Sequence, residues 1–161
     1  MRRLPLPDDA TADAALAAEY AAAREREGAV MAILRAFGPR AELVHAFLGL
    51  ADAALYGQAA LGRREREVLA LATSEANGAG YSAELHAALR GGGPPGPRDA
   101  ALIEFAQRVT LTPRESAAAT AALRAHLTVD ETYDAIAVVG LLNLANRAAL
   151  ATGITPADDL P

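Results

Sequence analysis

Alanine makes up about a quarter of this chain of 161 residues, and no stretch of it alternates apolar and polar residues with period two. Alanine is the strongest helix former because its side chain loses no rotamer freedom in a helix. Aromatic residues are only 4% of the chain and tryptophan is absent, so the helices can pack closely. We therefore expect an all-α fold without a sheet, a single-domain bundle of about six helices.

Proline and glycine mark the expected boundaries of this bundle. Two prolines oppose a helix within residues 1–9, which we expect to form an N-terminal arm. The helical domain follows over residues 10–153 and ends at a glycine, which leaves residues 154–161 as a C-terminal tail. The chain is long enough for one domain with a core and short for two. Helices are expected over 10–37, 39–56, 63–76, 80–90, 98–110, 113–126 and 129–152.

Local signals fix some of these helix ends. Asn77 and Gly78 both tolerate a left-handed conformation and predict the end of a helix. Thr112 with Glu115, and Thr128 with Glu131, have the spacing of capping boxes at helix starts. Gly28 is expected to weaken the first helix midway. The glycine- and proline-rich segment 91–97 is expected to be a loop.

Composition excludes several classes of function. The net charge is −5 and no basic run occurs, which argues against nucleic acid as a partner. The chain contains no cysteine, so disulfides, thiolate zinc sites and thiol redox chemistry are excluded within it. Its three histidines are too widely spaced for a metal motif. We expect no metal and no cofactor.

We also expect a soluble, cytoplasmic protein that does not associate with a membrane. No N-terminal stretch combines a positive start with an apolar segment. The longest weakly polar run, over residues 135–145, is too short to span a bilayer.

A candidate acid–base site lies between residues 67 and 86. Ser82 and His86 are four residues apart and share a helix face, with Tyr81 near the start of that helix. Glu67 lies in the preceding helix, so a tight helical hairpin would bring it back towards His86. Backbone N–H groups at a helix start favour negative charge, and Glu, His and Tyr are workable acid–base groups near neutral pH.

The same residues also allow a purely structural interpretation. Glu67 closes a run of five charged residues of both signs over residues 63–67, a pattern that is usual for a solvated helix face. A single histidine such as His86 is more often a surface or hydrogen-bonded core residue than a catalytic one. Spacing alone does not decide between the two interpretations.

The segment 67–86 resembles the signature of the carboxymuconolactone decarboxylase and alkylhydroperoxidase D-like superfamily. That signature is a Glu, eleven residues, Cys-x-x-Cys, and a His four residues after the second Cys. Glu67 and His86 stand at the Glu and His positions, whereas Ala79 and Ser82 stand where the cysteines belong. The resemblance extends over roughly residues 37–153 and includes the family's Asn-x-x-Asn-Arg pattern, here Asn143, Asn146 and Arg147.

The resemblance implies a central helical hairpin that carries the motif. It implies a homo-oligomer, a dimer, trimer or hexamer. It also implies a proton relay through Glu67, Tyr81 and His86. Ser82 takes the position of the attacking thiol and Ala79 that of the resolving thiol. A serine hydroxyl is a far weaker nucleophile than a thiolate and cannot cycle through a disulfide. Peroxidase activity is therefore not carried over.

Three hypotheses about function remain. The first is a cofactor-free acid–base enzyme, of decarboxylase, isomerase or lyase type, acting on a small carboxylated molecule. In it Glu67 and His86 move protons, Tyr81 donates a hydrogen bond and Ser82 orients the substrate. The second is a non-catalytic family member that serves as an oligomeric scaffold or binds a ligand. The third is a peroxidase that borrows a cysteine from a partner chain, which nothing in this chain supports.

Three polar residues interrupt the apolar last helix. Asn143, Asn146 and Arg147 need hydrogen-bond partners if they are buried. They would either join helices or subunits by hydrogen bonds, or face the pocket and bind a substrate carboxylate. The sequence leaves both alternatives open.

Overall fold

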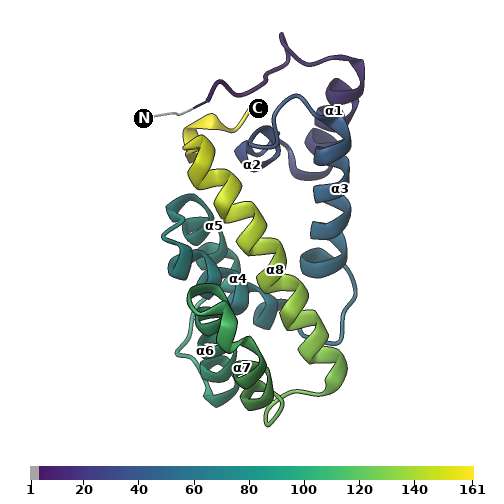
Figure 1. Ribbon diagram of the computed structural model, residues 1–161. Coiled ribbons are helices and arrows are strands. Elements are labelled where there is room, and N and C mark those ends of the chain that lie inside the picture. Colours follow the sequence, from purple (N-terminus) through teal and green to yellow (C-terminus); the bar gives the residue numbers. More distant parts are fainter. Residues whose placement is uncertain (1–3) are drawn as a thin grey trace. The chain divides into compact units, whose positions relative to one another are not determined.

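The computed structural model describes residues 4–161, which are all-α, as the sequence predicts. The only β-type pairing in this range is an isolated antiparallel bridge. The chain forms two compact units, one made of residues 4–50 and 147–161 and the other of residues 51–146. The first three residues of the expected N-terminal arm lie outside the described part of the chain. Figure 1 labels the helices.

The first unit begins with three helices, α1 (Ala14–Glu27), α2 (Ala32–Arg35) and α3 (Ala41–Ala51), the last residue of α3 belonging to the second unit. The single helix expected over 10–37 is thus two helices. Gly28 ends α1 in the left-handed conformation, with φ of 79°, which only glycine adopts without strain. Gly28 therefore marks the end of a helix and does not weaken the middle of a longer one.

The C-terminal residues pack within the first unit. Val30 and Leu160 exchange two backbone hydrogen bonds, with N···O distances of 2.8 and 2.9 Å. The buried guanidinium of Arg35 donates to the carbonyl oxygen of Pro7 at 2.7 Å and to that of Asp158. Arg35 thereby connects a residue near the start of the described chain to one near its end.

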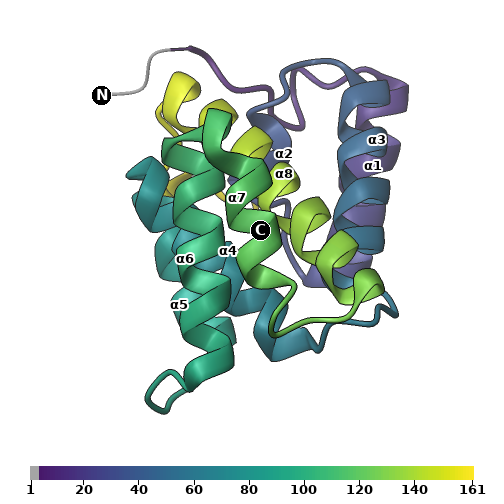
Figure 2. The same cartoon turned by 60° about the horizontal axis from the view of Figure 1, so that its bottom comes forward.

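The second unit contains the hairpin that carries the motif. Its helices are the π-helix η1 (Asp52–Tyr56), α4 (Arg63–Asn77), α5 (Gly80–Arg90), α6 (Pro97–Leu111), the 3₁₀ turn η2 (Pro113–Glu115), α7 (Ser116–Leu123) and α8 (Val129–Thr152), whose last residues belong to the first unit. The helix α4 packs against both α5 and α6, and Figure 2 shows these helices side by side with α7. The fully buried side chains of the second unit include Leu69, Leu102, Phe105 and Val138.

Acidic side chains at the third helical position cap the starts of three helices. Glu65 accepts a hydrogen bond from the backbone N–H of Gly62, and Asp99 accepts one from Gly96, both at 3.2 Å. The predicted capping box of Thr128 and Glu131 is confirmed. The one predicted at Thr112 is wrong. The hydroxyl of Thr112 donates to the carbonyl of Arg108 instead, and a 3₁₀ turn precedes α7.

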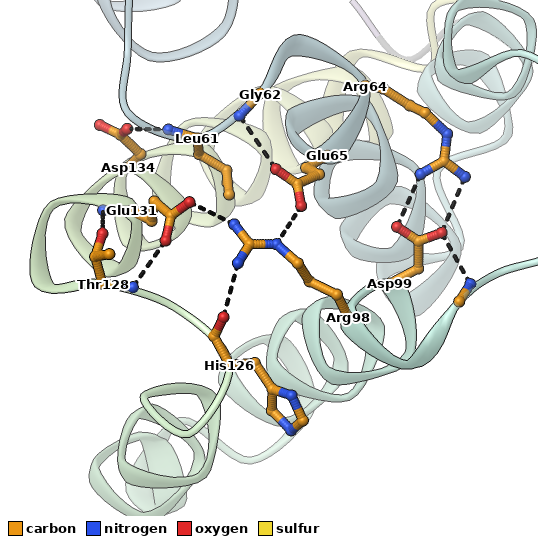
Figure 3. Close-up of polar contacts among 11 residues, drawn as sticks. Leu61, Gly62, Arg64, Glu65, Arg98, Asp99, His126, Thr128, Glu131 and Asp134 are labelled. Atoms are coloured by element: carbon orange, nitrogen blue, oxygen red, sulfur yellow. Dashed lines mark hydrogen bonds and ion pairs between the residues drawn. The ribbon is translucent and has the colours of Figure 1, made fainter.

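The same acids bind arginines from neighbouring helices (Figure 3). Arg98 of α6 donates to Glu65 of α4, to Glu131 of α8 and to the carbonyl oxygen of His126. We call Glu65, Arg98 and Glu131 the Arg98 cluster. A second arginine, Arg64 of α4, binds both carboxylate oxygens of Asp99 at the start of α6, at 2.8 and 2.9 Å. This contact holds the pKa of the Asp99 carboxyl below its ordinary value. The starts of three helices are thereby tied together.

A close backbone approach requires a glycine after the π-helix. The N–H of Gly57 donates to the carbonyl oxygen of Asp52 at 2.6 Å and closes the wide turn. A Cβ on Gly57 would lie 2.7 Å from that oxygen, which is closer than van der Waals contact allows. This segment also contacts two arginines near the site described below, through the ring of Tyr56 and the carbonyl oxygen of Gly57.

Gly57→Ala should therefore destabilise the protein by roughly 1–3 kcal/mol, the usual cost of forcing extra atoms into a packed site. The matched control is Gly140→Ala, in the middle of α8, where an added Cβ meets no atom within 4 Å. Alanine is the better helix former, so the control should stabilise by about 0.5–1 kcal/mol. Urea unfolding of both variants checks this, and equal midpoints would contradict it.

The helix α8 has the length and composition of a membrane span. It has 24 residues, and its most apolar window has a mean hydropathy of 1.5. Half of that window is buried inside the protein. The buried core helix of a soluble protein can have the same length and hydropathy.

Candidate functional site

The turn between α4 and α5 brings Glu67 and His86 into contact. Gly78 ends α4 in the left-handed conformation, and the N–H of Ala79 returns to the carbonyl oxygen of Ser74 at 2.9 Å. The two helices then lie against one another, and Nδ1 of His86 lies 2.8 Å from Oε2 of Glu67. Glu67 is 1% exposed and His86 5%. The carboxylate is thus buried and does not lie on a solvated helix face.

The other carboxylate oxygen of Glu67 is held by Arg63, one helical turn earlier. Nε and Nη2 of Arg63 lie 2.8 and 2.6 Å from Oε1 of Glu67. The side chain of Arg63 is 43% exposed, and its guanidinium lies 4.7 Å from the centre of the Tyr56 ring. A chain of contacts therefore leads from the partly exposed Arg63 through Glu67 to the buried His86.

These contacts set the protonation state of Glu67. Burial raises the pKa of the Glu67 carboxyl, but the hydrogen bonds and charges of His86 and Arg63 outweigh burial and leave the pKa below its ordinary value. An ionised carboxylate only accepts hydrogen bonds, so Nδ1 of His86 must carry a proton. A neutral His86 then presents Nε2 as the proton acceptor. Glu67 is accordingly the residue that positions the imidazole.

The lowered pKa of Glu67 makes stability depend on pH. Its carboxyl contributes stability that is fully present above about pH 4.3, the ordinary pKa of glutamate, and that is lost as the pH falls through the lower pKa of the folded state. The stability of Glu67→Gln should therefore fall less steeply on acidification than that of the wild type. Urea midpoints over a series of acidic pH values measure both slopes, and parallel slopes would contradict the assignment.

The remaining residues of the motif lie at the start of α5. Ser82 is 4% exposed and lies one turn before His86 on the same helix face. Ala79, at the other cysteine position of the signature, is also buried and precedes the first residue of α5. Tyr81 is half-buried in the first turn of this helix. The hairpin thus carries the four expected catalytic residues on two adjacent helices.

The two asparagines of α8 join helices. Asn143 accepts a hydrogen bond from Asn77 at 3.0 Å and donates to the hydroxyl of Thr110 at 3.1 Å. Asn146 is fully buried and donates to the hydroxyl of Ser74 at 3.2 Å. These contacts match the structural alternative and link α8 to α4 and α6. Arg147 is exposed and belongs to the first unit.

Sequence reasoning missed two arginines on α4. The sequence places Arg63 and Arg66 in a charge run that is typical of a solvated helix face, yet Arg66 is 5% exposed. Its Nη1 donates to the carbonyl oxygen of Gly57 at 2.9 Å. The available signal was the spacing, because residues 63, 66 and 67 lie on one face of a helix.

Across residues 4–161, no group of three or more His, Asp or Glu side chains is arranged to hold a metal ion. The polar atoms of the site are carboxylate, imidazole, hydroxyl and guanidinium groups. This set can orient, accept and donate protons.

Solved structures with this fold include two bacterial proteins. One is an uncharacterized peroxidase-related protein from Silicibacter sp. TM1040, with 24% identity and a TM-score of 0.76 over 96% of this chain and 90% of that chain. The other is the alkylhydroperoxidase AhpD core, an uncharacterized peroxidase-related protein from Ralstonia eutropha JMP134. It has 26% identity and a TM-score of 0.77 over 96% of this chain and 92% of that chain. Comparison with curated proteins gave no match.

The family is settled by a match to a family model. The model of the carboxymuconolactone decarboxylase family matches residues 41–124, more than half of the chain. The matched segment contains Glu67, Ser82 and His86 together with the helices that carry them. The chain therefore belongs to the carboxymuconolactone decarboxylase family.

Proposed function

We propose that this protein is a cofactor-free acid–base enzyme that acts on a small carboxylated molecule, in a reaction of decarboxylase, isomerase or lyase type. The observation that supports it most is the buried contact of 2.8 Å between Oε2 of Glu67 and Nδ1 of His86. A carboxylate that holds one imidazole nitrogen leaves the other to accept a proton, which is the usual arrangement of a general base and the group that orients it.

In the proposed reaction, Nε2 of His86 takes a proton from a carbon next to a carbonyl or carboxylate group. The resulting imidazolium lies beside the ionised Glu67, whose charge stabilises it. In an isomerisation His86 then returns the proton to another atom of the same molecule, and in a lyase step to the leaving group. A decarboxylation instead starts from the imidazolium form of His86. The bond to the carboxylate carbon breaks, carbon dioxide leaves, and the carbon that keeps the electron pair takes the proton of the imidazolium, which regains a proton from solvent. Tyr81 donates a hydrogen bond to the oxygen on which negative charge develops, and Ser82 orients the substrate.

The third hypothesis, a peroxidase, has no support in the chain. A thiol peroxidase needs a thiolate that attacks the peroxide and a second thiol that resolves it. The sequence contains no cysteine, and the two cysteine positions of the signature hold Ala79 and Ser82. The peroxidase-related descriptions of the two similar structures apply to those proteins.

A non-catalytic family member is the second candidate. The observation that favours it is the burial of the motif, because Ala79, Ser82 and His86 all have less than a tenth of their surface exposed. A packed polar pair of this kind also serves to hold two helices together. In this alternative Glu67 and His86 fix the hairpin of a scaffold or of a ligand-binding protein.

Both candidate functions, the enzyme and the non-catalytic protein, include the formation of a homo-oligomer. Large apolar side chains remain exposed along one face of α8 at helical spacing, among them Tyr133, which is 68% exposed, Val129, Ile136 and Leu144. Exposed apolar faces of this kind are covered in assemblies. Assembly into a dimer, trimer or hexamer is the proposal, and light scattering of the purified protein measures it.

Proton exchange tests the proposed function directly. The protein is incubated in heavy water with a panel of small keto acids and carboxylated lactones, and proton NMR follows carbon–deuterium exchange and loss of the carboxyl group. Exchange or decarboxylation of at least one compound is expected. His86→Gln should slow it by about 10²–10⁴-fold, the usual contribution of a general base. Equal rates in wild type and His86→Gln, or no reaction with any compound, favour the non-catalytic candidate.

A further inference from the structure

Two arginines on α4 converge on the π-helix that precedes it. The guanidinium of Arg63 lies over the ring of Tyr56, and Nη1 of Arg66 donates to the carbonyl oxygens of Gly57 at 2.9 Å and Ala54 at 3.4 Å. Three residues apart, the arginines are neighbours on one helix face. A π-helix is rare and often marks a functional site. Here it receives two positive side chains next to the Glu67 carboxylate.

Among the described residues, part of the guanidinium of Arg66 has no hydrogen-bond partner. Within residues 4–161 its hydrogen bonds go to neutral carbonyl oxygens, and its buried Nε has no hydrogen-bond partner. Burial, followed by the positive charge of Arg63, lowers the pKa of Arg66. Burying a charge without a counter-ion is costly, and buried guanidinium groups are normally matched by an anion.

The nearby carboxylates already have other partners. Asp134 and Glu67 are the acids whose charge reaches Arg66. Asp134 accepts a hydrogen bond from the N–H of Leu61 at 2.8 Å. Both oxygens of Glu67 are used by an arginine and a histidine. Neither acid forms an ion pair with Arg66, so its charge is left for an anion from outside the described chain.

Arg63 offers a route for such an anion. Nε and Nη2 of Arg63 bind Glu67, while close to half of its side chain is exposed. A planar guanidinium has more than one donor edge, and a second carboxylate can bind on the edge that faces solvent. The ring of Tyr56 supports the guanidinium plane from one side.

We propose that Arg63 and Arg66 form a binding site for the carboxylate of a small molecule, beside the Glu67–His86 pair. Arg63 receives the carboxylate at the surface, and the buried charge of Arg66 holds it. The inference rests on the proposed function, because it names the groups that would hold the substrate while His86 moves the proton. This site is different from the one that the sequence also allows, in which Asn143, Asn146 or Arg147 binds the carboxylate.

Calorimetric titration at low salt tests this site without requiring turnover. The probe is succinate, and succinamide is its neutral counterpart of similar shape. Wild type should bind succinate and not succinamide. Arg63→Gln should weaken succinate binding about 10-fold or more, because a charge-assisted hydrogen bond is lost. Arg64→Gln is the matched control. It removes an arginine of the same turn that is paired with Asp99, and it should bind succinate as the wild type does.

Arg66→Lys tests the buried group, with the unfolding midpoint as the check that the variant is folded. It keeps the charge but removes the planar donors, so succinate binding should weaken. No succinate binding by the wild type, equal binding of succinamide, or equal losses in Arg63→Gln and Arg64→Gln would each overturn the inference. Succinate binding that depends on Arg63, without proton exchange on any compound, would overturn the proposed function alone. Exchange without such binding would overturn this inference alone.

Discussion

Replacing Glu67 with glutamine is expected to slow proton transfer by about 10²–10⁴-fold, as removal of a general base does. The carboxylate accepts hydrogen bonds from two donors, Arg63 and Nδ1 of His86. A glutamine amide has one acceptor oxygen and one donor nitrogen. Arg63 cannot lose its proton, so the amide oxygen would face Arg63 and the amide nitrogen would face His86. Nδ1 must then become the acceptor, and the proton moves to Nε2, where the base is needed.

The matched control for this variant is Glu65→Gln. Glu65 lies on the same helix two residues earlier and belongs to the Arg98 cluster, and its oxygens bind Arg98 and the N–H of Gly62. The substitution should cost some stability and leave the rate of proton transfer within a few-fold of the wild type. The measurement is the rate of carbon–deuterium exchange for both variants with the same compound. A Glu67→Gln variant as fast as Glu65→Gln would rule out the positioning role.

Arg98→Gln is expected to destabilise the protein by roughly 1–3 kcal/mol, between the value of an exposed ion pair and that of a broken buried pair. Arg98 is about a third exposed, whereas its partners Glu65 and Glu131 are largely buried. Without Arg98, both carboxylates keep only their capping hydrogen bonds, and the carbonyl of His126 loses its donor. The starts of α4, α6 and α8 would no longer share a cation.

Arg108→Gln provides the comparison for Arg98. Arg108 lies on the same helix and pairs with Glu104 one turn earlier and, at 3.6 Å, with Glu115, but about half or more of each of these side chains is exposed. Removing such a pair should cost no more than about 0.5 kcal/mol. Urea unfolding measures both variants. Equal losses of stability in Arg98→Gln and Arg108→Gln would contradict the stabilising role of the Arg98 cluster.

Local sequence signals predicted the helices of the second unit well. Gly78 ends α4 and Thr128 starts α8, because each signal acts through atoms within a few residues of it. The hairpin geometry followed from them, since the length of the turn and the helical repeat already bring residue 67 towards residue 86. The contact between Glu67 and His86 could therefore be anticipated from spacing.

Contacts between distant residues could not be predicted in this way. Arg64 meets Asp99 across 35 residues, and Arg98 meets Glu131 across 33. No local pattern distinguishes such arginines from those of a solvated face. The π-helix before Gly57 has no sequence signature either. Its one wide turn is set by packing and by the close approach of the Gly57 backbone to the carbonyl oxygen of Asp52, which leaves no room for a Cβ. The contacts of Arg66 depend on that turn, so the shared helix face of residues 63, 66 and 67 does not predict them by itself.

The proposed role of His86 depends on its tautomer, and nitrogen NMR of the imidazole measures that tautomer directly. With the ring labelled, the shifts and proton couplings of the two nitrogens show which of them carries the proton at a pH where the ring is neutral. The positioning role of Glu67 predicts a protonated Nδ1, held by Glu67, and an unprotonated Nε2 in the wild type, with the proton moved to Nε2 in Glu67→Gln. A wild-type His86 that carries its proton on Nε2, or the same tautomer in both proteins, would contradict it.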